Sequence, residues 1–346
     1  MHKNLLSLLA LLIPLAGAGQ GDRVTAFEPG EAWVDTDGNR IQAHGGGMLE
    51  RNGTYYWFGE DMSAPTDAKT QNVALTGVSC YSSQDLLNWK NEGLALRAVK
   101  DDPAHDLAPA NAAERPKVIY NRRTRNYVMW LHIDKSVLNK QGWFGYEYAR
   151  AAVAVADKPA GPYRYLGSMR PDGQESRDMT VFQDRDGKAY LIFSSKGNRT
   201  MHISLLTDDY LKPSGKSAEA FVDQYREAPA MFRAGDRYFL ITSKCTGWKP
   251  NQALYAVARS PLGPWEVKGN PCTGPDAELT FHSQSTHVLQ VPGRRDSFIL
   301  LADRWNPLNL GDTRDVWLPL IVSGERIEIP WAERWDFTFF DRLKRP

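Results

Sequence analysis

The sequence predicts an all-β fold and, within that class, a five-bladed β-propeller. Short runs rich in Tyr, Phe, Val, Ile and Trp recur along the whole chain, bounded by Gly, Asn, Asp or Pro, while helical periodicity is scarce. Five segments share one plan, in which a polar residue opens a short apolar strand, a polar turn follows, and the second strand is strongly aromatic or aliphatic. A unit that returns about every 50 to 70 residues suits a four-stranded propeller blade, whereas sandwiches and barrels do not repeat a unit at that spacing.

The first two copies of this plan are predicted hairpins at residues 44–60 and 114–131. The first has the strand HGGGML, a turn at Asn52-Gly53 and the aromatic strand YYWFGE. Asn-Gly between two such runs is a strong signal for a hairpin turn. The second pairs ERPKVIY, which begins at Glu114, with YVMWL.

The other three hairpins are predicted at residues 178–193, 227–241 and 284–301. The third turns at Asp186-Gly187 and the fourth at Gly235-Asp236. Further strands follow each hairpin, and phrases such as LGPW at 262–265 predict outer turns that carry an aromatic plug between blades. Each hairpin therefore predicts the inner half of one blade.

The N-terminus predicts a signal peptide over residues 1–18. A short basic start is followed by an apolar run from Leu5 to Leu15 and the small residues Ala16-Gly17-Ala18. The run is shorter than the roughly 20 residues that a membrane-spanning helix needs. We therefore expect an exported protein, periplasmic or extracellular, whose residues 19–346 form a single catalytic propeller domain without a membrane span.

The charge balance argues against a nucleic-acid partner, and the cysteine content argues against a fold held together by disulfides. The chain has 42 basic and 41 acidic residues and no long basic run, so we expect no nucleic-acid partner. The three cysteines cannot form a disulfide framework, although one pair, such as Cys245 and Cys272, could be bridged. No zinc-ligand spacing occurs, and we expect a monomer.

The polar residues that open the five hairpins are expected to converge. In a propeller, the first strand of each blade lines the central channel, so equivalent positions meet at the axis. A single acidic residue at a strand start is more often a solvated turn or a cap. Carboxylates that share a narrow pocket repel each other and lose hydration, which raises at least one pKa and is costly unless function retains it. The five residues are His44, Glu114, Asp178, Glu227 and Gln284.

Glycoside hydrolysis requires a set of this kind. One carboxylic acid protonates the leaving oxygen, and a second group activates water or attacks the sugar. The chain also has 11 tryptophans, and flat rings stack on the apolar faces of sugars. Packing between blades is the alternative role for each of these aromatic residues. The candidates for such sugar-binding walls are Trp57, Tyr146, Trp248 and Trp305.

Six motifs resemble those of glycoside hydrolase family 43, and more narrowly its exo-β-1,3-galactanase (galactan 1,3-β-galactosidase) branch. They are AHGGG at 43–47, YYWFGE at 55–60, ERPKV at 114–118, SRDMT at 176–180, REAP at 226–229 and SQST at 283–286. The resemblance covers essentially the whole mature chain in order. It implies a five-bladed propeller with an axial pocket, an inverting mechanism, and removal of galactose from the non-reducing end of β-1,3-galactan, such as the arabinogalactan backbone.

The resemblance also implies roles for individual residues. Glu227 matches the general acid, and Asp178 matches the carboxylate that orients the acid and tunes its pKa. The usual base, an Asp on the first blade, is absent here, as it is in the galactanase branch. Gln284 would then position water, with Glu114 the nearest carboxylate to take a proton.

The remaining expectations concern sugar contacts and cations. By the same matching, Glu60, Tyr146 and Thr246 are candidate contacts to sugar hydroxyls, and His44, Trp248 and Trp305 are further candidates for substrate binding. No cofactor or metal is expected to be required. A structural cation in the central channel stays open, because His44, His282 and His287 flank the axis either as cation neighbours or as hydrogen-bonded core residues.

Two other functions stay open. The first is an α-L-arabinofuranosidase or β-xylosidase, because such enzymes dominate the wider family; the absent first-blade Asp weakens it. The second is a carbohydrate-binding propeller without catalysis. The missing Asp supports it, but retention of Glu227, Asp178 and Glu114 together counts against it.

Overall fold

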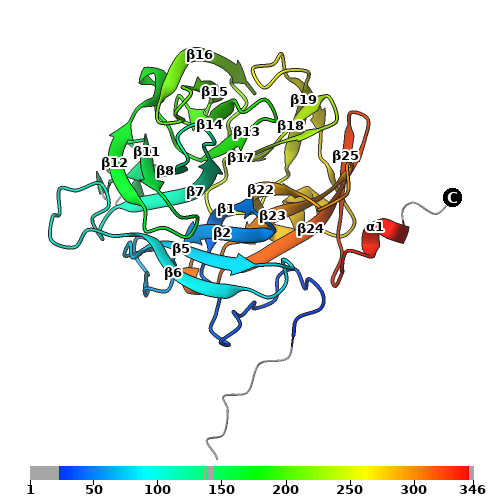
Figure 1. The fold of residues 1–346 in the computed structure, drawn as a ribbon, viewed down its shortest axis with the longest axis horizontal. Coiled ribbons are helices and arrows are strands. Elements are labelled where there is room, and N and C mark those ends of the chain that lie inside the picture. Colours follow the sequence, from blue (N-terminus) through cyan, green and yellow to red (C-terminus); the bar gives the residue numbers. More distant parts are fainter. Residues whose placement is uncertain (1–22, 136, 139–143, 343–346) are drawn as a thin grey trace, which may run out of the picture.

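The structure is a computed structural model that describes residues 23–135, 137–138 and 144–342. Five antiparallel sheets stand around a central axis, which confirms the predicted five-bladed propeller (Figure 1). The predicted signal peptide over residues 1–18 lies outside the described residues. No helix among the described residues is long and apolar enough to cross a membrane.

Each blade is one sheet, and its strands follow in chain order from the innermost strand at the axis to the outermost. The strands of the first blade are β1 (His44–Arg51), β2 (Thr54–Glu60), β5 (Gly77–Ser83) and β6 (Lys90–Arg97). Those of the second are β7 (Ala112–Tyr120), β8 (Tyr127–Asp134), β11 (Arg150–Ala156) and β12 (Arg164–Met169). Those of the third are β13 (Met179–Gln183), β14 (Ala189–Ser195), β15 (Thr200–Leu206) and β16 (Pro213–Ala220).

The fourth and fifth blades complete the ring. The fourth comprises β17 (Arg226–Ala234), β18 (Arg237–Lys244), β19 (Leu254–Ala258) and β20 (Glu266–Gly269). The fifth comprises β22 (Gln284–Gln290), β23 (Ser297–Arg304), β24 (Arg314–Ser323) and β25 (Arg326–Pro330), and the short β21 (Cys272–Thr273) joins its outer edge in parallel. The five predicted hairpins are thus the inner two strands of the five blades.

Short elements lie in the connections. They are the two-stranded pairs β3 (Thr66–Asp67) with β4 (Asn72–Val73) and β9 (Val137–Leu138) with β10 (Phe144–Gly145), the 3₁₀ turns η1 (Pro171–Gly173), η2 (Ala277–His282) and η3 (Leu310–Asp312), and the C-terminal α1 (Phe339–Arg342).

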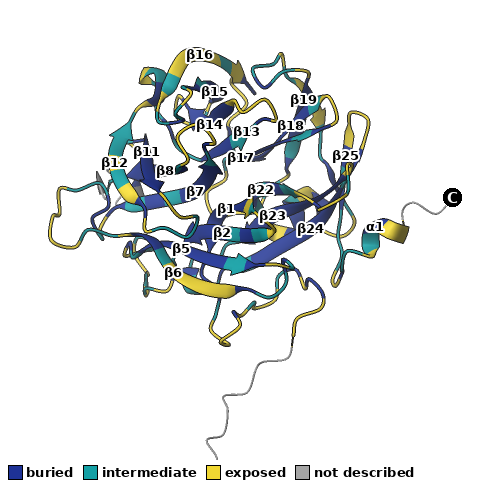
Figure 2. Cartoon of the chain, in the orientation of Figure 1, coloured by how far each residue is buried: buried dark blue, intermediate teal, exposed yellow. Residues whose placement is uncertain are grey.

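The hydrophobic core lies between neighbouring blades. Five apolar clusters occur, and each combines side chains from two adjacent blades. Exposed residues gather on outer strands such as β6 and β16 and on the loops (Figure 2). The inner strands are therefore held rigidly, which fixes the residues that open them.

An aromatic cluster closes the ring between the fifth and first blades. The rings of Trp57 on β2 and Trp317 on β24 lie 4.7 Å apart, and Phe27 stacks on Trp335 at 4.4 Å, which ties the N-terminal segment to the C-terminal one. Trp57 is only 2% exposed, so it packs between blades and forms no wall for a sugar.

The disulfide between Cys245 and Cys272 that the sequence analysis left open is absent from the structure. All three cysteines are free thiols: Cys80 and Cys272 are buried within blade cores, whereas Cys245 is partly exposed near the axis. Inter-blade packing, without a covalent link between the blades, holds the described chain together.

Candidate active site

A cavity of about 950 Å³ opens at one mouth of the central channel. Four of the five residues that open the hairpins line it, namely Glu114, Asp178, Glu227 and Gln284. The cavity is also lined by five of the six predicted substrate-binding residues, namely Glu60, Tyr146, Thr246, Trp248 and Trp305. Four of the residues that the repeat singled out therefore share one cavity, although the repeat predicted no contacts within it.

A backbone irregularity aims the opening residues at the axis. The inner strands of the first, second and fourth blades each show a register shift just after the opening residue. The next residue has a positive φ, which is 62° at Gly45, 53° at Arg115 and 53° at Ala228. Such bulges re-aim a side chain and are common beside active sites. At Gly45 a Cβ would lie 2.2 Å from Oε1 of Glu60, so only glycine fits.

Glu227 has the environment of a general acid. Its Oε1 accepts a hydrogen bond from Nε2 of Gln284 at 3.1 Å, and its Oε2 accepts one from Nδ2 of Asn198 at 3.2 Å. Burial, and next the nearby charge of Asp178, raise the pKa of Glu227 to about 8. Glu227 therefore carries its proton at neutral pH, as a group that protonates a leaving oxygen must.

Asp178 is hydrogen-bonded to the strand that carries Glu227. Its Oδ2 accepts a hydrogen bond from the backbone N–H of Ala228, the residue after Glu227, at 3.0 Å. The same oxygen lies 2.9 Å from Nε of Arg115. Asp178 thus acts on Glu227 in two ways, since it fixes the backbone beside it and opposes loss of its proton.

Arg115 contacts residues from several blades, a role that the sequence analysis did not predict. Its guanidinium contacts Asp178 and donates to the backbone oxygen of Ser285 at 3.2 Å and to Oε1 of Gln284 at 2.5 Å. Its backbone N–H donates to Oε1 of Glu60 at 2.9 Å. Through its side chain and its backbone, this one buried residue therefore joins the first, second, third and fifth blades at the axis.

The amide of Gln284 is fully hydrogen-bonded within the protein. Its Oε1 accepts from Arg115 and from Nε1 of Trp305 at 3.1 Å. Its Nε2 donates to Glu227 and to Oγ of Ser243 at 3.0 Å. A primary amide has two donor hydrogens and two acceptor lone pairs, so all four positions are occupied. In this arrangement Gln284 orients the acid, and a role in holding water requires substrate to displace one of these partners.

Glu114 ends a chain of three titratable side chains. Its Oε1 accepts a hydrogen bond from the Tyr146 hydroxyl at 3.0 Å, and its Oε2 lies 3.0 Å from Nδ1 of His132. Nε2 of His132 lies 2.9 Å from Oδ2 of Asp134, whose oxygens also accept the backbone N–H groups at positions 148–149. Burial opposes a charge on His132, but the hydrogen bonds to Asp134 and Glu114 outweigh it and raise its pKa to about 9. A protonated His132 therefore donates to both carboxylates.

The sequence held a signal for this chain. Glu114 and His132 are cross-strand partners on β7 and β8, and His132 and Asp134 are two residues apart on β8. Residues spaced by two point to the same face of a strand. The phrase His-Ile-Asp at the end of a buried strand could thus have been found.

Glu60 and Tyr146 are enclosed polar groups in the cavity wall. Burial, and next the charge of Glu114, raise the pKa of Glu60 well above its usual range. The same two causes raise the pKa of the Tyr146 phenol. Both shifts favour the protonated form of the side chain, so that each can exchange hydrogen bonds with sugar hydroxyls.

Two tryptophans form an aromatic rim. The rings of Trp248 and Trp305 lie 5.8 Å apart in an edge-to-face arrangement, and Trp248 is 38% exposed. Thr246 lies beside them, and its hydroxyl donates to the backbone oxygen of Lys249 at 2.6 Å. This rim offers a flat apolar face at the cavity mouth.

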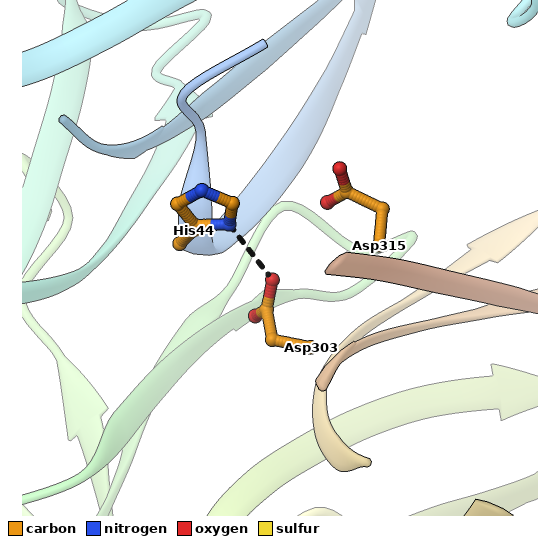
Figure 3. Close-up of side chains that lie close together, drawn as sticks. All are labelled: His44, Asp303 and Asp315. Carbon is orange, nitrogen blue, oxygen red and sulfur yellow. Dashed lines mark hydrogen bonds and ion pairs between the residues drawn. The ribbon is translucent and has the colours of Figure 1, made fainter. Parts of the chain in front are cut away.

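His44 does not lie where it was expected. Its side chain is 0% exposed and is absent from the cavity wall, because its ring points toward the fifth blade and Asp303, 3.4 Å from Nδ1 (Figure 3). The prediction that His44 contacts substrate is therefore wrong. The bulge after this residue directs the backbone N–H of Gly45, and not the imidazole, toward the axis side of Asp303, which accepts it at 2.9 Å.

The cluster of Glu114, His132 and Asp178 is poorly suited to hold a metal ion. Ligand atoms of Glu114, His132 and Asp178 lie within 4.8 Å of one another. Both nitrogens of His132 are already paired, with Glu114 and Asp134, so no imidazole lone pair is free for a cation. Of the other axial histidines, His287 is half-buried, and loss of hydration lowers its pKa to about 3, whereas His282 is exposed at the cavity edge.

A five-bladed propeller with a protonated carboxylic acid and a second carboxylate in one axial cavity has the fold and site of a glycoside hydrolase. The chain belongs to the glycosyl hydrolases family 43, whose family model matches residues 47–315.

Solved structures of this family superpose on most of the chain. A β-1,3-galactosidase is 39% identical, with a TM-score of 0.86, and the match covers 93% of this chain and 66% of that one. A second β-1,3-galactosidase, with galactodeoxynojirimycin, is 42% identical with a TM-score of 0.83, and covers 90% and 100%. An exo-β-1,3-galactanase from Clostridium thermocellum is 36% identical with a TM-score of 0.78, and covers 89% and 66%.

Curated relatives are more distant, and their matches span only part of each protein. A β-D-galactofuranosidase of Aspergillus niger is 29% identical over 136 residues, and a xylan 1,3-β-xylosidase of Vibrio sp is 25% identical over 204 residues. These matches cover 36% and 55% of this chain and span 39% and 36% of the relatives' own lengths.

Proposed function

We propose that this protein is an exo-acting β-1,3-galactosidase that releases galactose from β-1,3-galactan, the backbone of arabinogalactan, with inversion at the anomeric carbon. The observation that carries the chemistry is Glu227, a cavity carboxyl group whose pKa is raised to about 8. The galactan specificity is supported by similar structures, since the three described above, which are named for β-1,3-galactosidase or exo-β-1,3-galactanase activity, are 36% to 42% identical over most of the chain.

The acid half of the reaction falls to Glu227. It gives its proton to the glycosidic oxygen as the bond from that oxygen to the anomeric carbon breaks. Asp178 holds the neighbouring backbone N–H and keeps the proton on Glu227 until the leaving oxygen accepts it. Gln284 and Asn198 each hold one carboxyl oxygen, which fixes the direction of the proton.

The water half of the reaction falls to Glu114. Water attacks the anomeric carbon from the face opposite the leaving oxygen, and Glu114 accepts one of its protons. The charged His132 donates a hydrogen bond to Oε2 of Glu114, which orients the carboxyl group that is proposed as the base. The products are galactose with an inverted anomeric centre and a polymer shorter by one residue.

Substrate binding is assigned to the cavity wall and its rim. Glu60, Tyr146 and Thr246 offer polar groups to the hydroxyls of the terminal sugar. Trp248 and Trp305 offer apolar faces to sugar rings at the mouth. Exo action requires the polymer to enter this cavity by its terminus, with the terminal sugar beside Arg115 and its partners.

We also propose that the enzyme is exported and works as a monomer without a required cofactor. The apolar N-terminal run and its small-residue end support export. Acid and base in the cavity are both supplied by protein carboxyl groups, which supports cleavage without a cofactor.

The experiment that tests the function is product analysis with β-1,3-galactan, arabinan and xylan as parallel substrates. Galactose from the first alone is expected, accumulating without intermediate oligosaccharides. Arabinose or xylose from the other two would instead show the pentose-releasing activity of the wider family. Binding of galactan without any product after long incubation would show a carbohydrate-binding propeller.

A further inference from the structure

A second cluster of titratable side chains lies beside the active-site cavity, at the seam between the first and fifth blades. His44 opens β1, while Asp303 and Asp315 are cross-strand partners on β23 and β24 (Figure 3). Their exposed fractions are 0%, 3% and 1%. One ligand atom from each residue lies within 4.8 Å of the other two. Three groups able to bind a cation are thus enclosed together.

The polar atoms of this cluster are incompletely satisfied. Oδ2 of Asp303 accepts the backbone N–H of Gly45 at 2.9 Å, and its Oδ1 lies 3.4 Å from Nδ1 of His44. Within the described part of the chain, Oδ2 of Asp315 and Nε2 of His44 are buried and have no hydrogen-bond partner. Figure 3 shows the carboxylate of Asp315 directed toward the imidazole. Native proteins rarely leave buried carboxylate oxygens unpaired, so an unpaired one calls for a partner.

The nearest guanidinium leaves this need unmet. Arg40 is close enough to Asp315 to interact with its charge. However, its Nη2 donates to the backbone oxygen of Thr313 at 2.5 Å, and no hydrogen bond to Asp315 is formed in the described structure. Two carboxylates therefore share a buried space with an imidazole and without a directly bonded cation.

We propose that His44, Asp303 and Asp315 bind a divalent metal ion, with Zn²⁺ fitting the ligand set best. One imidazole nitrogen and two carboxylate oxygens form a mixed set that zinc accepts, whereas Ca²⁺ takes six to eight oxygen ligands. The 3.4 Å between His44 and Asp303 is long for a hydrogen bond. It matches the edge of a tetrahedron with metal–ligand bonds of about 2.1 Å.

The fourth position and the route to it lie on the cavity side. Asp303 also borders the active-site cavity, which gives an ion a path from solvent and leaves room for a water ligand. The ligands are far apart in the chain, since His44 and Asp303 are separated by 259 positions, so no local sequence spacing indicates the site. The bound ion would fasten β1 to β23 and β24.

This ion is structural, and its position gives it an indirect link to the reaction. Asp303 is the cross-strand partner of Gln284, and Trp305 follows it by two residues. An ion on Asp303 therefore steadies the wall that orients Glu227. The site does not depend on the substrate proposed above, since metal content and thermal stability are measured without substrate.

The first test is the metal content of the purified protein. Wild-type protein, dialysed against metal-free buffer and then loaded with one equivalent of Zn²⁺, is expected to retain about one ion per chain by plasma mass spectrometry. Asp315→Asn and His44→Gln, which preserve size and remove a ligand, are expected to retain at least tenfold less. The control is Asp312→Asn, because Asp312 lies three residues before Asp315, has a partly exposed side chain and pairs with Arg314.

The second test is a thermal shift of the wild-type protein. Removal of metal with a chelator is expected to lower the melting temperature by a few degrees, and Zn²⁺ to restore it, with Mn²⁺ and Ca²⁺ as comparisons. Wild-type protein that retains no metal and shows no shift with any of the three ions overturns the proposal. So does undiminished Zn²⁺ retention by both ligand variants. Because the wild-type results stand alone, a variant that fails to fold leaves the test decisive.

Discussion

Nδ1 of His132 lies 3.0 Å from Oε2 of Glu114, directly across the pair of inner strands in the second blade. The other ring nitrogen is held by Asp134, so the imidazole bridges two carboxylates and carries a charge at neutral pH. The residue proposed to activate water is thus oriented by a buried cation, not by bulk solvent.

Replacement of His132 tests this bridge. His132→Gln can still donate one hydrogen bond but has no charge, so kcat is expected to fall by about ten- to a hundredfold with KM little changed. Asp134→Asn is expected to act in the same direction, because it removes the anchor of the ring. Steady-state kinetics on a β-1,3-linked galactobiose provide the measurement, and wild-type kcat in both variants would show that the bridge serves packing alone.

Replacement of Glu227 tests the acid. Glu227→Gln preserves the size of the side chain and one of its two oxygen acceptors but has no transferable proton, so kcat is expected to fall about a thousandfold or more. Glu219→Gln is the control, since Glu219 pairs with Lys196 on an outer strand. Rates within a few fold of wild type for Glu227→Gln would remove Glu227 from the mechanism.

The pH dependence of kcat/KM follows from the same group. The acid must be protonated in the free enzyme, and the pKa of Glu227 is about 8, so activity is expected to decline above that pH. The charge of Asp178 contributes to this raised value. Asp178→Asn should therefore move the alkaline limb to lower pH, besides lowering the rate. An alkaline limb that stays in place in the variant argues against electrostatic coupling between the two carboxyl groups.

The raised pKa also predicts how stability depends on pH. The folded pKa of Glu227, about 8, exceeds its ordinary value of 4.5, so the native state binds this proton more tightly than the unfolded state. The contribution is complete below pH 4.5 and is lost as the pH rises through 8. Between these pH values the free energy of unfolding should fall by about 2 kcal/mol more in wild type than in Glu227→Gln, after allowance for solvent in the cavity. Urea unfolding at both pH values measures the difference, and parallel curves would contradict it.

The aromatic cluster between the fifth and first blades leads to a prediction about stability. Trp57 is buried against Trp317, so Trp57→Ala is expected to lower the free energy of unfolding by about 3 to 5 kcal/mol. Trp248→Ala, at the exposed rim, should leave stability within about 1 kcal/mol of wild type and raise KM. Urea denaturation of the two variants separates the roles, and equal destabilisation would mean that Trp248 also packs as a core residue.

The free thiols make a simple chemical prediction. Unfolded protein should release three equivalents of thiol per chain in a colorimetric thiol assay without reductant. Native protein should react slowly, because burial raises the pKa of the thiols and the thiolate is the reactive form. One equivalent from the unfolded chain would indicate a disulfide.

The fold could be predicted from the sequence because the blade is a repeat. Strand alternation, turn residues and a polar opening position recur five times, and a propeller geometry then converts that recurrence into convergence on one axis. Four of the five opening residues line the cavity for this reason.

The failures have a different physical origin. The direction of His44 depends on a bulge and on an unusual backbone conformation at Gly45, which strand periodicity does not encode. Arg115 was missed because its partners come from three other blades. These contacts exist only once the ring has closed.

The most direct measurement of the central claim is proton NMR of the sugar released from β-1,3-linked galactotriose during the first turnovers. With Glu227 as acid and water attacking from the opposite face, the account predicts that free galactose appears first as the α-anomer and that galactobiose is the companion product. Galactose that appears first as the β-anomer, or the absence of any galactose signal, would contradict it.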